Sequence, residues 1–147
     1  MRRRACSIST ERRYRTEQSR GRQSSLGESA TAHVRLARAD VMIDTADYLI
    51  RGAARRALAA TSLSNHEQIP VRARLRMEFA YAAELCLEAA RMIADGAGSS
   101  VFRSDHPFQR LFRDIQVMCS HVGFDSDAVA ELHGRVLLGM PPNTMIL

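Results

Sequence analysis

Lysine and tryptophan are both missing from the 147 residues, and aromatic residues make up only 5% of the sequence. Alanine and leucine are abundant instead, and such a composition favours an all-helical protein. The alternation of apolar and polar residues that is typical of a strand does not occur. No apolar run approaches the roughly 20 residues that a membrane-spanning helix requires, so the sequence predicts no such helix.

Cysteine is scarce, and its spacing does not match a metal-binding framework. Cys6, Cys86 and Cys119 make an odd number, and the last two fall on apolar helical stripes. This pattern is typical of small buried thiols in a reducing compartment. No secretory apolar segment follows the N-terminal arginines, so we expect a cytoplasmic protein.

Several common catalytic and ligand-binding motifs are absent as well. His33, His66, His106 and His133 show no ligand spacing with one another, with cysteines or with acids, so we predict no metal site. The sequence holds no serine-histidine-aspartate order, no phosphate-binding P-loop and no dinucleotide fingerprint. It therefore does not indicate a metalloenzyme, a serine hydrolase or a P-loop protein.

Residues 1–27 differ in composition from the rest of the chain. Residues 1–25 hold eight of the 21 arginines and two of the 16 acids, a net charge of +6, which leaves −1 for the remainder. Because they hold almost no apolar residues, we expect a disordered Arg/Ser-rich tail, or a segment created by a truncated or misplaced reading frame. A basic arm for nucleic acid or anionic membrane and an organelle transit peptide are alternatives; Glu11 and Glu17 count against the transit peptide. We predict neither a nucleic-acid partner nor a membrane partner.

Residues 28–147 show the periodicity of an all-α protein, an up-down helical bundle. The first helix is predicted from about residue 28 to residue 60. Two sets of residues that repeat every seven positions form a seam over four heptads, and a further apolar line lies on another face. The seam consists of Leu36, Ile43, Ile50 and Ala57 with Ala39, Ala46, Ala53 and Ala60, and the further line of Val34, Val41 and Tyr48. A helix with two apolar faces requires neighbours on both.

Three more helices are predicted. After a polar loop at 61–69, Pro70 begins a helix over 70–95 whose alanines allow close helix approach. The third helix covers 107–122 and is closed by Gly123, and the fourth covers about 126–138 after a cap at Asp125 or Ser126. Residues predicted to face inward are Phe108, Leu111, Phe112, Ile115, Cys119 and Val122 of the third helix, and Val129, Leu132, Val136 and Leu137 of the fourth.

The stretch from residue 94 to residue 123 carries the candidate site. Its opening turn contains Gly96, Gly98, Ser99 and Ser100, in which glycines permit positive φ and close approach and serines add donors. We expect Asp105 to accept hydrogen bonds from the first N–H groups of the third helix, and Pro107 to occupy its first turn. The same helix is predicted to carry His121 at its far end.

The run PFQRLFRD from Pro107 to Asp114, preceded by a glycine-serine turn and followed by His121, resembles the C-terminal bundle of the acyl-CoA dehydrogenase superfamily. It is most similar to the flavin-dependent monooxygenase branch, the oxygenase components of two-component systems such as p-hydroxyphenylacetate hydroxylase and dibenzothiophene monooxygenase. The resemblance covers roughly residues 29–147. It implies that the bundle lacks its usual first helix, whose place the Arg-rich segment takes.

This resemblance implies roles for two groups of residues. His121 would lie near the flavin ring and substrate as an acid/base, a task that suits an imidazole with a pKa near about 6.5. The dehydrogenases of the superfamily carry a catalytic glutamate one residue further on, where this chain has Val122. Gly96, Gly98, Ser99 and Ser100 would offer backbone to the diphosphate or adenosine end of the flavin, often across a subunit interface. From the residues alone, a structural histidine and a plain interhelical turn remain open.

The expected function is that of the C-terminal domain, as a fragment or truncated product, of a flavin-dependent monooxygenase. By resemblance, the whole enzyme would take reduced FMN or FAD from a separate flavin reductase, oxygenate a small organic substrate and assemble as a homo-tetramer. The N-terminal helical domain and the β-domain of the superfamily are missing here, so we do not expect the isolated chain to be catalytically complete. An acyl-CoA dehydrogenase remnant and a non-catalytic helical oligomerisation or interaction module are the alternatives.

Overall fold

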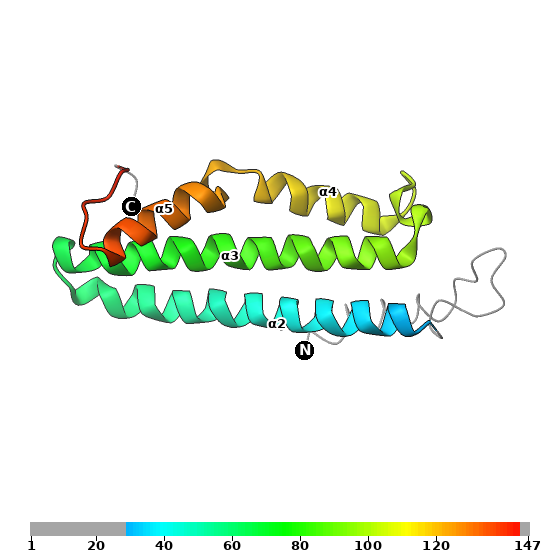
Figure 1. The fold of residues 1–147 in the computed structure, drawn as a ribbon, viewed down its shortest axis with the longest axis horizontal. Helices are drawn as coiled ribbons and strands as arrows, with labels where there is room; N and C mark the ends of the chain where they lie inside the picture. Colours follow the sequence, from blue (N-terminus) through cyan, green and yellow to red (C-terminus); the bar gives the residue numbers. More distant parts are fainter. Residues whose placement is uncertain (1–28, 145–147) are drawn as a thin grey trace.

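The computed structural model describes residues 29–144, in which all the regular elements are helical. Two long helices, α2 (Ala30–Ala59) and α3 (Asn65–Ala97), run antiparallel side by side (Figure 1). The shorter helices α4 (Pro107–Cys119) and α5 (Ser126–Leu137) follow one another along the opposite side of α3. The 3₁₀ turns η2 (Ala60–Ser62), η3 (Ser99–Phe102) and η4 (Val122–Phe124) lie between these helices. The predicted all-α bundle is confirmed, with α3 as its middle layer.

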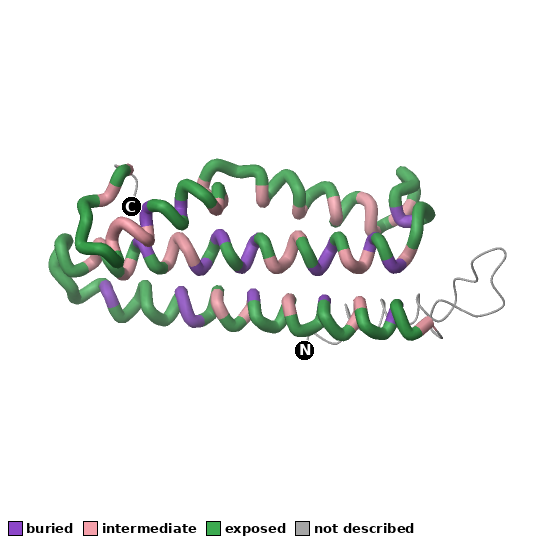
Figure 2. Tube along the Cα trace, viewed as in Figure 1, coloured by how far each residue is buried: buried purple, intermediate pink, exposed green. Residues whose placement is uncertain are grey.

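Helix α2 is the element that the sequence predicted best, because its periodicity is the most regular. Ala39, Ala46 and Ala53, which recur every seven residues, are each only 1% exposed, and Figure 2 shows buried positions at regular intervals along α2. Methyl side chains at the contact let the two helix backbones approach closely. The larger side chains of the predicted seam lie at its margin, since Ile43 and Ile50 are 48% and 42% exposed.

Helix α3 begins five residues earlier than Pro70, so the prediction of a polar loop through residue 69 was wrong. The reason is a capping box: the Ser64 hydroxyl accepts from the Glu67 N–H at 3.4 Å, and the Glu67 carboxylate accepts from the Ser64 N–H at 3.0 Å. The Ser64 hydrogen bonds lower the pKa of Glu67. Pro70 lies inside α3, just beyond the first turn, and it has no N–H to donate to the His66 carbonyl one turn earlier.

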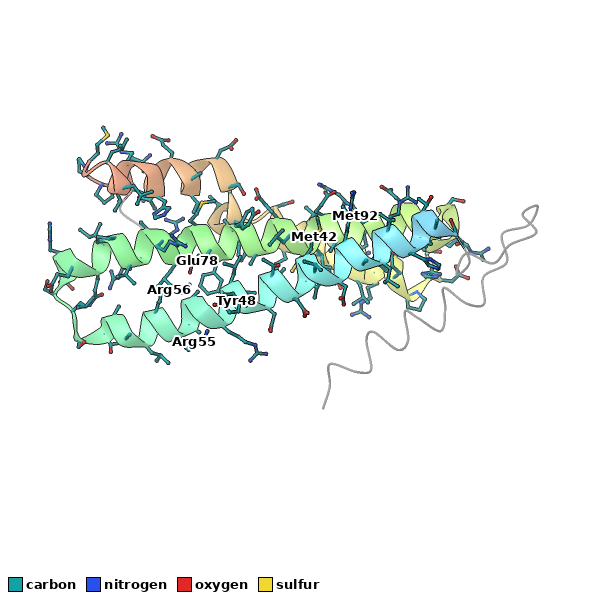
Figure 3. The ribbon with its side chains drawn as sticks, turned by 60° about the horizontal axis from the view of Figure 1, so that its bottom comes forward. Met42, Tyr48, Arg55, Arg56, Glu78 and Met92 are labelled. Carbon is teal, nitrogen blue, oxygen red and sulfur yellow. The ribbon has the colours of Figure 1, made fainter. Side chains whose placement is uncertain are left out.

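One buried charge joins α2 to α3. Glu78 is the buried polar residue of the described core, at 5% exposure, and its carboxylate accepts from Arg56 of α2 and, at 2.8 Å, from Arg74 Nε. Figure 3 shows Arg56 and Glu78 reaching toward each other across the two helices. A Cβ at Gly52 would lie 3.2 Å from the Arg56 guanidinium, so the glycine makes room for it. The periodicity of the sequence did not single out these residues.

The middle helix uses two faces, and the contacts of three residues identify them. Glu78 points toward α2, so the residues that share its face by helical spacing, such as Ala82 and Ala89, lie toward α2 as well. Ala83 and Glu84 instead contact the layer of α4 and α5. Alanine is therefore buried on both faces of α3, and the predicted close approach of neighbouring helices occurs on both.

The outer layer is less buried than the sequence predicted. Helix α4 has no fully buried residue, although the Phe108 and Phe112 rings stack at 5.9 Å. Leu111, Val122 and Leu137 were predicted to face inward, and they are 62%, 77% and 73% exposed. Each short helix packs mainly on α3, and α4 also contacts η3 through the Phe102 and Phe112 rings, so only a narrow contact stripe of each helix is covered. In α5 that stripe contains Val129 and Leu132, both buried as predicted.

The start of α4 also differs from the prediction. The capping residue is His106, whose Nδ1 accepts from the Phe108 N–H at 3.2 Å, while Pro107 takes the first helical position as expected. Asp105 pairs with Arg103 instead, with Arg103 Nε 3.0 Å from Asp105 Oδ1, and this guanidinium lowers the pKa of the carboxyl. At α5 the predicted cap is confirmed, because Asp125 accepts from the Ala128 N–H at 3.2 Å.

The predictions about the N-terminal segment concern residues that the structure does not describe. The predicted tail at residues 1–27, and the missing first helix of the bundle, lie outside residues 29–144 and stay predictions. Within the described helices, none combines the length and the hydropathy that a bilayer crossing demands.

Candidate functional site

His121 lies just beyond α4 rather than on its last turn, because the helix ends at Cys119. Its backbone is extended, with φ −70° and ψ 138°, and it opens the turn η4. The prediction of a helix that continues to Val122 was therefore wrong. The imidazole is exposed, and its ring meets the Phe124 ring edge-on with centroids 6.4 Å apart.

The backbone of Gly123 holds the His121 ring. The Gly123 N–H donates to His121 Nδ1 at 3.0 Å. A Cβ on Gly123 would lie 3.1 Å from the same Nδ1, which is tighter than an ordinary contact. In a neutral imidazole one nitrogen carries the proton and the other accepts, so acceptance at Nδ1 places the proton on Nε2. The exposed ring is thus arranged to donate a hydrogen bond from Nε2.

The segment that carries His121 is attached to α3 on both sides. Before it, the Cys119 thiol donates to the Ala83 carbonyl at 3.5 Å; after it, the Ser126 hydroxyl donates to the Glu84 carboxylate. Ala83 and Glu84 are neighbours on α3, so both attachments converge on one place. Sequence reasoning missed Glu84, because nothing in its periodicity distinguishes it from another exposed acid such as Glu88.

Several apolar residues of α4 and of the turn that follows it are exposed. Leu111 and Met118 are 62% and 49% exposed, and Val117 and Val122 are 67% and 77% exposed. Large apolar side chains left exposed over one segment are a feature of surfaces that bind another group or polypeptide.

The predicted glycine-serine turn lies at the opposite end of α4. Gly96 is buried within α3, whereas Gly98 ends that helix with φ +80°, a conformation that favours glycine. A Cβ at Gly98 would meet no atom within 4 Å, so the space beside it is open. Ser99 and Ser100 are exposed and begin η3. Thirteen helical residues separate this turn from the His121 segment, about 20 Å at 1.5 Å per residue.

Charged residues on α4 form only surface pairs. Arg110 Nε and Arg113 lie 3.8 Å from the Asp114 carboxylate, and all three side chains are more than half exposed. Such pairs contribute little to stability. Between residues 29 and 144, no three histidine, cysteine or acidic side chains gather closely enough to hold a metal ion. Burial raises the pKa of Cys86 and of Cys119, so neither thiol is activated as a nucleophile.

The chain is similar in sequence to a known protein family and to characterised enzymes. Residues 3–126 match the family model described as acyl-CoA dehydrogenase, C-terminal domain. The chain is 39% identical over 72 residues to the oxygenase component of p-hydroxyphenylacetate 3-hydroxylase from Acinetobacter baumannii, which covers 48% of this chain and 17% of that protein. It is 29% identical over 126 residues to the oxygenase component of an FADH2-dependent resorcinol hydroxylase from a Rhizobium strain, which covers 83% of this chain and 31% of that protein.

A solved structure shows the same fold. XiaF from Streptomyces, in complex with FADH2 and glycerol, superimposes on 98% of this chain with a TM-score of 0.84 and 22% sequence identity. This chain covers 37% of the XiaF chain. The chain thus spans less than two fifths of each of these three proteins.

Proposed function

Because this chain belongs to the acyl-CoA dehydrogenase C-terminal domain family, we propose that it is the C-terminal bundle of a flavin-dependent monooxygenase, the oxygenase component of a two-component system. Two relatives that are oxygenase components of hydroxylases support the monooxygenase branch of the family. The observation that carries the proposal is the His121 turn, an imidazole held by Gly123 amid exposed apolar side chains.

In this proposal His121 acts on the substrate side of the flavin. Reduced flavin, when bound, supplies the electrons for oxygen activation. The imidazole contributes a hydrogen bond from Nε2 to the oxygen of a small organic substrate and so orients it. Neither Gly96 nor Gly98, Ser99 and Ser100 can touch the same small group, since they lie about 20 Å away along α4. In the same proposal the diphosphate or adenosine end of a flavin, bound to the same chain or a second one, would contact the exposed backbone at Gly98, where a Cβ would meet no atom within 4 Å.

The cofactor and partners are part of the same proposal. Two of the similar proteins are named with FADH2, which favours reduced FAD over reduced FMN for the complete enzyme. A separate flavin reductase would supply it, as two-component systems require. We also propose a homo-oligomer, a tetramer by resemblance, because Val34, Val41 and Tyr48 leave an apolar line on α2 exposed. A cytoplasmic location stays a prediction.

The alternatives are less well supported. If the chain were an acyl-CoA dehydrogenase remnant, we would expect a catalytic glutamate at the position that Val122 occupies. The carboxylates of Asp125, which ends η4, and of Glu84 already accept from the Ala128 N–H and the Ser126 hydroxyl. A purely structural interaction module is not favoured, since the relatives are oxygenase components.

Anaerobic titration of the 15N-labelled chain with reduced FAD tests the proposal. We expect resonances of His121 and Gly123, or of Gly98 to Ser100, to shift with added flavin, and light scattering to report more than one chain per particle. His121→Ala should abolish the shifts at Gly123, whereas His66→Ala, at an exposed histidine on the first turn of α3, should leave them unchanged. If reduced FAD at millimolar concentration moves none of these resonances, the proposal fails.

A further inference from the structure

We propose that Gly123 and Glu84 are positioning residues that hold His121 as a hydrogen-bond donor through Nε2. The use of that donor rests on the function proposed above, but the geometry belongs to this chain alone. The sequence pattern indicated Gly123 only as the residue that closes the third helix and did not indicate Glu84, and each acts on the imidazole through a different contact.

Gly123 sets the tautomer and the orientation of the ring. Its N–H donates to His121 Nδ1 at 3.0 Å, and the absence of a Cβ leaves room for that nitrogen, which would otherwise lie 3.1 Å from the added carbon. The φ angle of Gly123 is not positive, so its backbone is one that alanine also adopts. It is therefore the neighbouring ring in its present position, rather than the turn itself, that favours glycine here.

Glu84 sets the place of the turn on α3. The carboxylate accepts from Ser126, the first residue of α5, while the preceding helix is tied to Ala83 through Cys119 at 3.5 Å. His121 and Gly123 lie between these two attachments. Loss of the contact at Glu84 removes one of the two hydrogen bonds that tie the segment to α3, so we expect the ring to be held less firmly in its direction, although η4 and α5 still pack on α3.

This arrangement has a chemical consequence. To take a proton from a substrate at Nε2, the ring would first have to carry its own proton on Nδ1 instead, and that Nδ1–H would face the Gly123 N–H. Two donors would then point at each other. The held ring therefore favours hydrogen-bond donation from Nε2 over proton abstraction, which narrows the acid/base role that the sequence suggested.

The tautomer can be measured directly in the full 147-residue chain. Long-range 1H–15N spectra at alkaline pH, where the imidazole is neutral, should show a pyrrole-type Nε2 and an acceptor-type Nδ1 for His121. Gly123→Ala should raise the population of the other tautomer and speed hydrogen exchange of the amide at position 123 about five- to tenfold, as expected for one lost hydrogen bond. Gly134→Ala on α5 is the matched control, because a Cβ there meets nothing within 4 Å.

A second set of variants tests Glu84. Glu84→Leu should accelerate exchange at position 123 and broaden the His121 signals, and Ser126→Ala should reproduce both effects. Glu84→Gln, which keeps an acceptor oxygen, should restore most of the behaviour. Glu88→Leu, one turn further along α3 with its partner Arg91 at 3.9 Å, should change neither signal. Far-UV circular dichroism checks that every variant remains helical.

Each result supports or overturns the inference. It fails if His121 is mainly protonated at Nδ1 in the native chain, or if Glu84→Leu behaves as Glu88→Leu does. Because no flavin is added, the outcome is independent of the flavin titration. A fixed tautomer without a flavin response would overturn the proposed function and leave this inference intact, and the reverse pattern would do the opposite.

Discussion

The α2–α3 pair and the α4–α5 layer are built from similar proportions of apolar residues, yet they bury them to different extents. In the pair, Ala39, Ala46 and Ala53 of α2 are almost completely covered by α3. In the layer, α4 has no fully buried residue, and Leu111 and Val117 remain more than three fifths exposed. Small side chains close the first interface, whereas large ones leave the second open.

The difference indicates a division of work between the two regions. A closed interface between long helices supplies stability, because apolar area removed from water is the main favourable term in folding. An open layer with exposed apolar side chains retains surface for another polypeptide or a ligand. His121 belongs to the open layer, and its attachments at Ala83 and Glu84 connect it to the closed pair.

The largest effect is expected from a larger side chain in the closed α2–α3 interface. Ala46→Leu places three extra carbons where the residue is 1% exposed and α2 packs on α3, so we expect a loss of about 3 kcal/mol in the free energy of unfolding. Urea denaturation measures it. Ala37→Leu, at an exposed position of the same helix, should change stability by less than about 0.5 kcal/mol. Equal losses would show that the interface is not closed.

The buried charge should produce the next largest effect. Glu78→Gln leaves Arg56 and Arg74 without their carboxylate, and we expect a loss of about 1–2 kcal/mol in unfolding free energy. The loss stays below the 3–5 kcal/mol or so of a fully buried pair, because the two arginine side chains are 46% and 58% exposed and water solvates them. Asp47→Asn, which breaks the exposed pair with Arg51 at 2.9 Å, should leave the urea midpoint unchanged. A midpoint shift equal to that of Glu78→Gln would contradict the argument.

The open layer should tolerate truncation. Leu111→Ala and Met118→Ala remove residues that are 62% and 49% exposed, so each should change the free energy of unfolding by less than about 0.5 kcal/mol. The same variants should reduce any self-association seen by light scattering, if this surface is covered in the complete enzyme. A stability loss near 2 kcal/mol would mean that these residues belong to the core of the folded chain.

Much of the fold could be predicted because long helices repeat their pattern many times. The seven-residue spacing of alanines in α2 gave its ends to within two residues, and the cap at Asp125 followed from local chemistry. The early start of α3 was readable too, since Ser64 and Glu67 have the spacing of a capping box, but Pro70 was taken as the first residue. At this position the capping box marked the true start of the helix, and the prediction followed Pro70 instead.

The site was harder to predict, because its geometry depends on contacts between distant parts of the chain. The apolar spacing of α4 continues to Val122, but the helix ends at Cys119, so His121 was placed on the wrong element. Glu84 and Ser126 are 42 residues apart and meet only when α5 packs on α3. Periodicity describes which face of a helix is apolar. It does not reveal which acid on α3 will meet the His121 turn.

The smallest effect expected concerns the thiols at the boundary between the two regions. Burial raises the pKa of Cys86 and of Cys119, and the proximity of Cys86 raises that of Cys119 further. In a Cys6→Ser background, alkylation by iodoacetamide should therefore be slower than that of a free thiol at the same pH, and should reach that rate in guanidinium. Since the unfolded chain loses these protons at lower pH, stability should fall slightly as the pH rises through the ordinary thiol pKa. Rapid alkylation of the native chain would show that α4 separates readily from α3, and the open layer would then be a loosely held one.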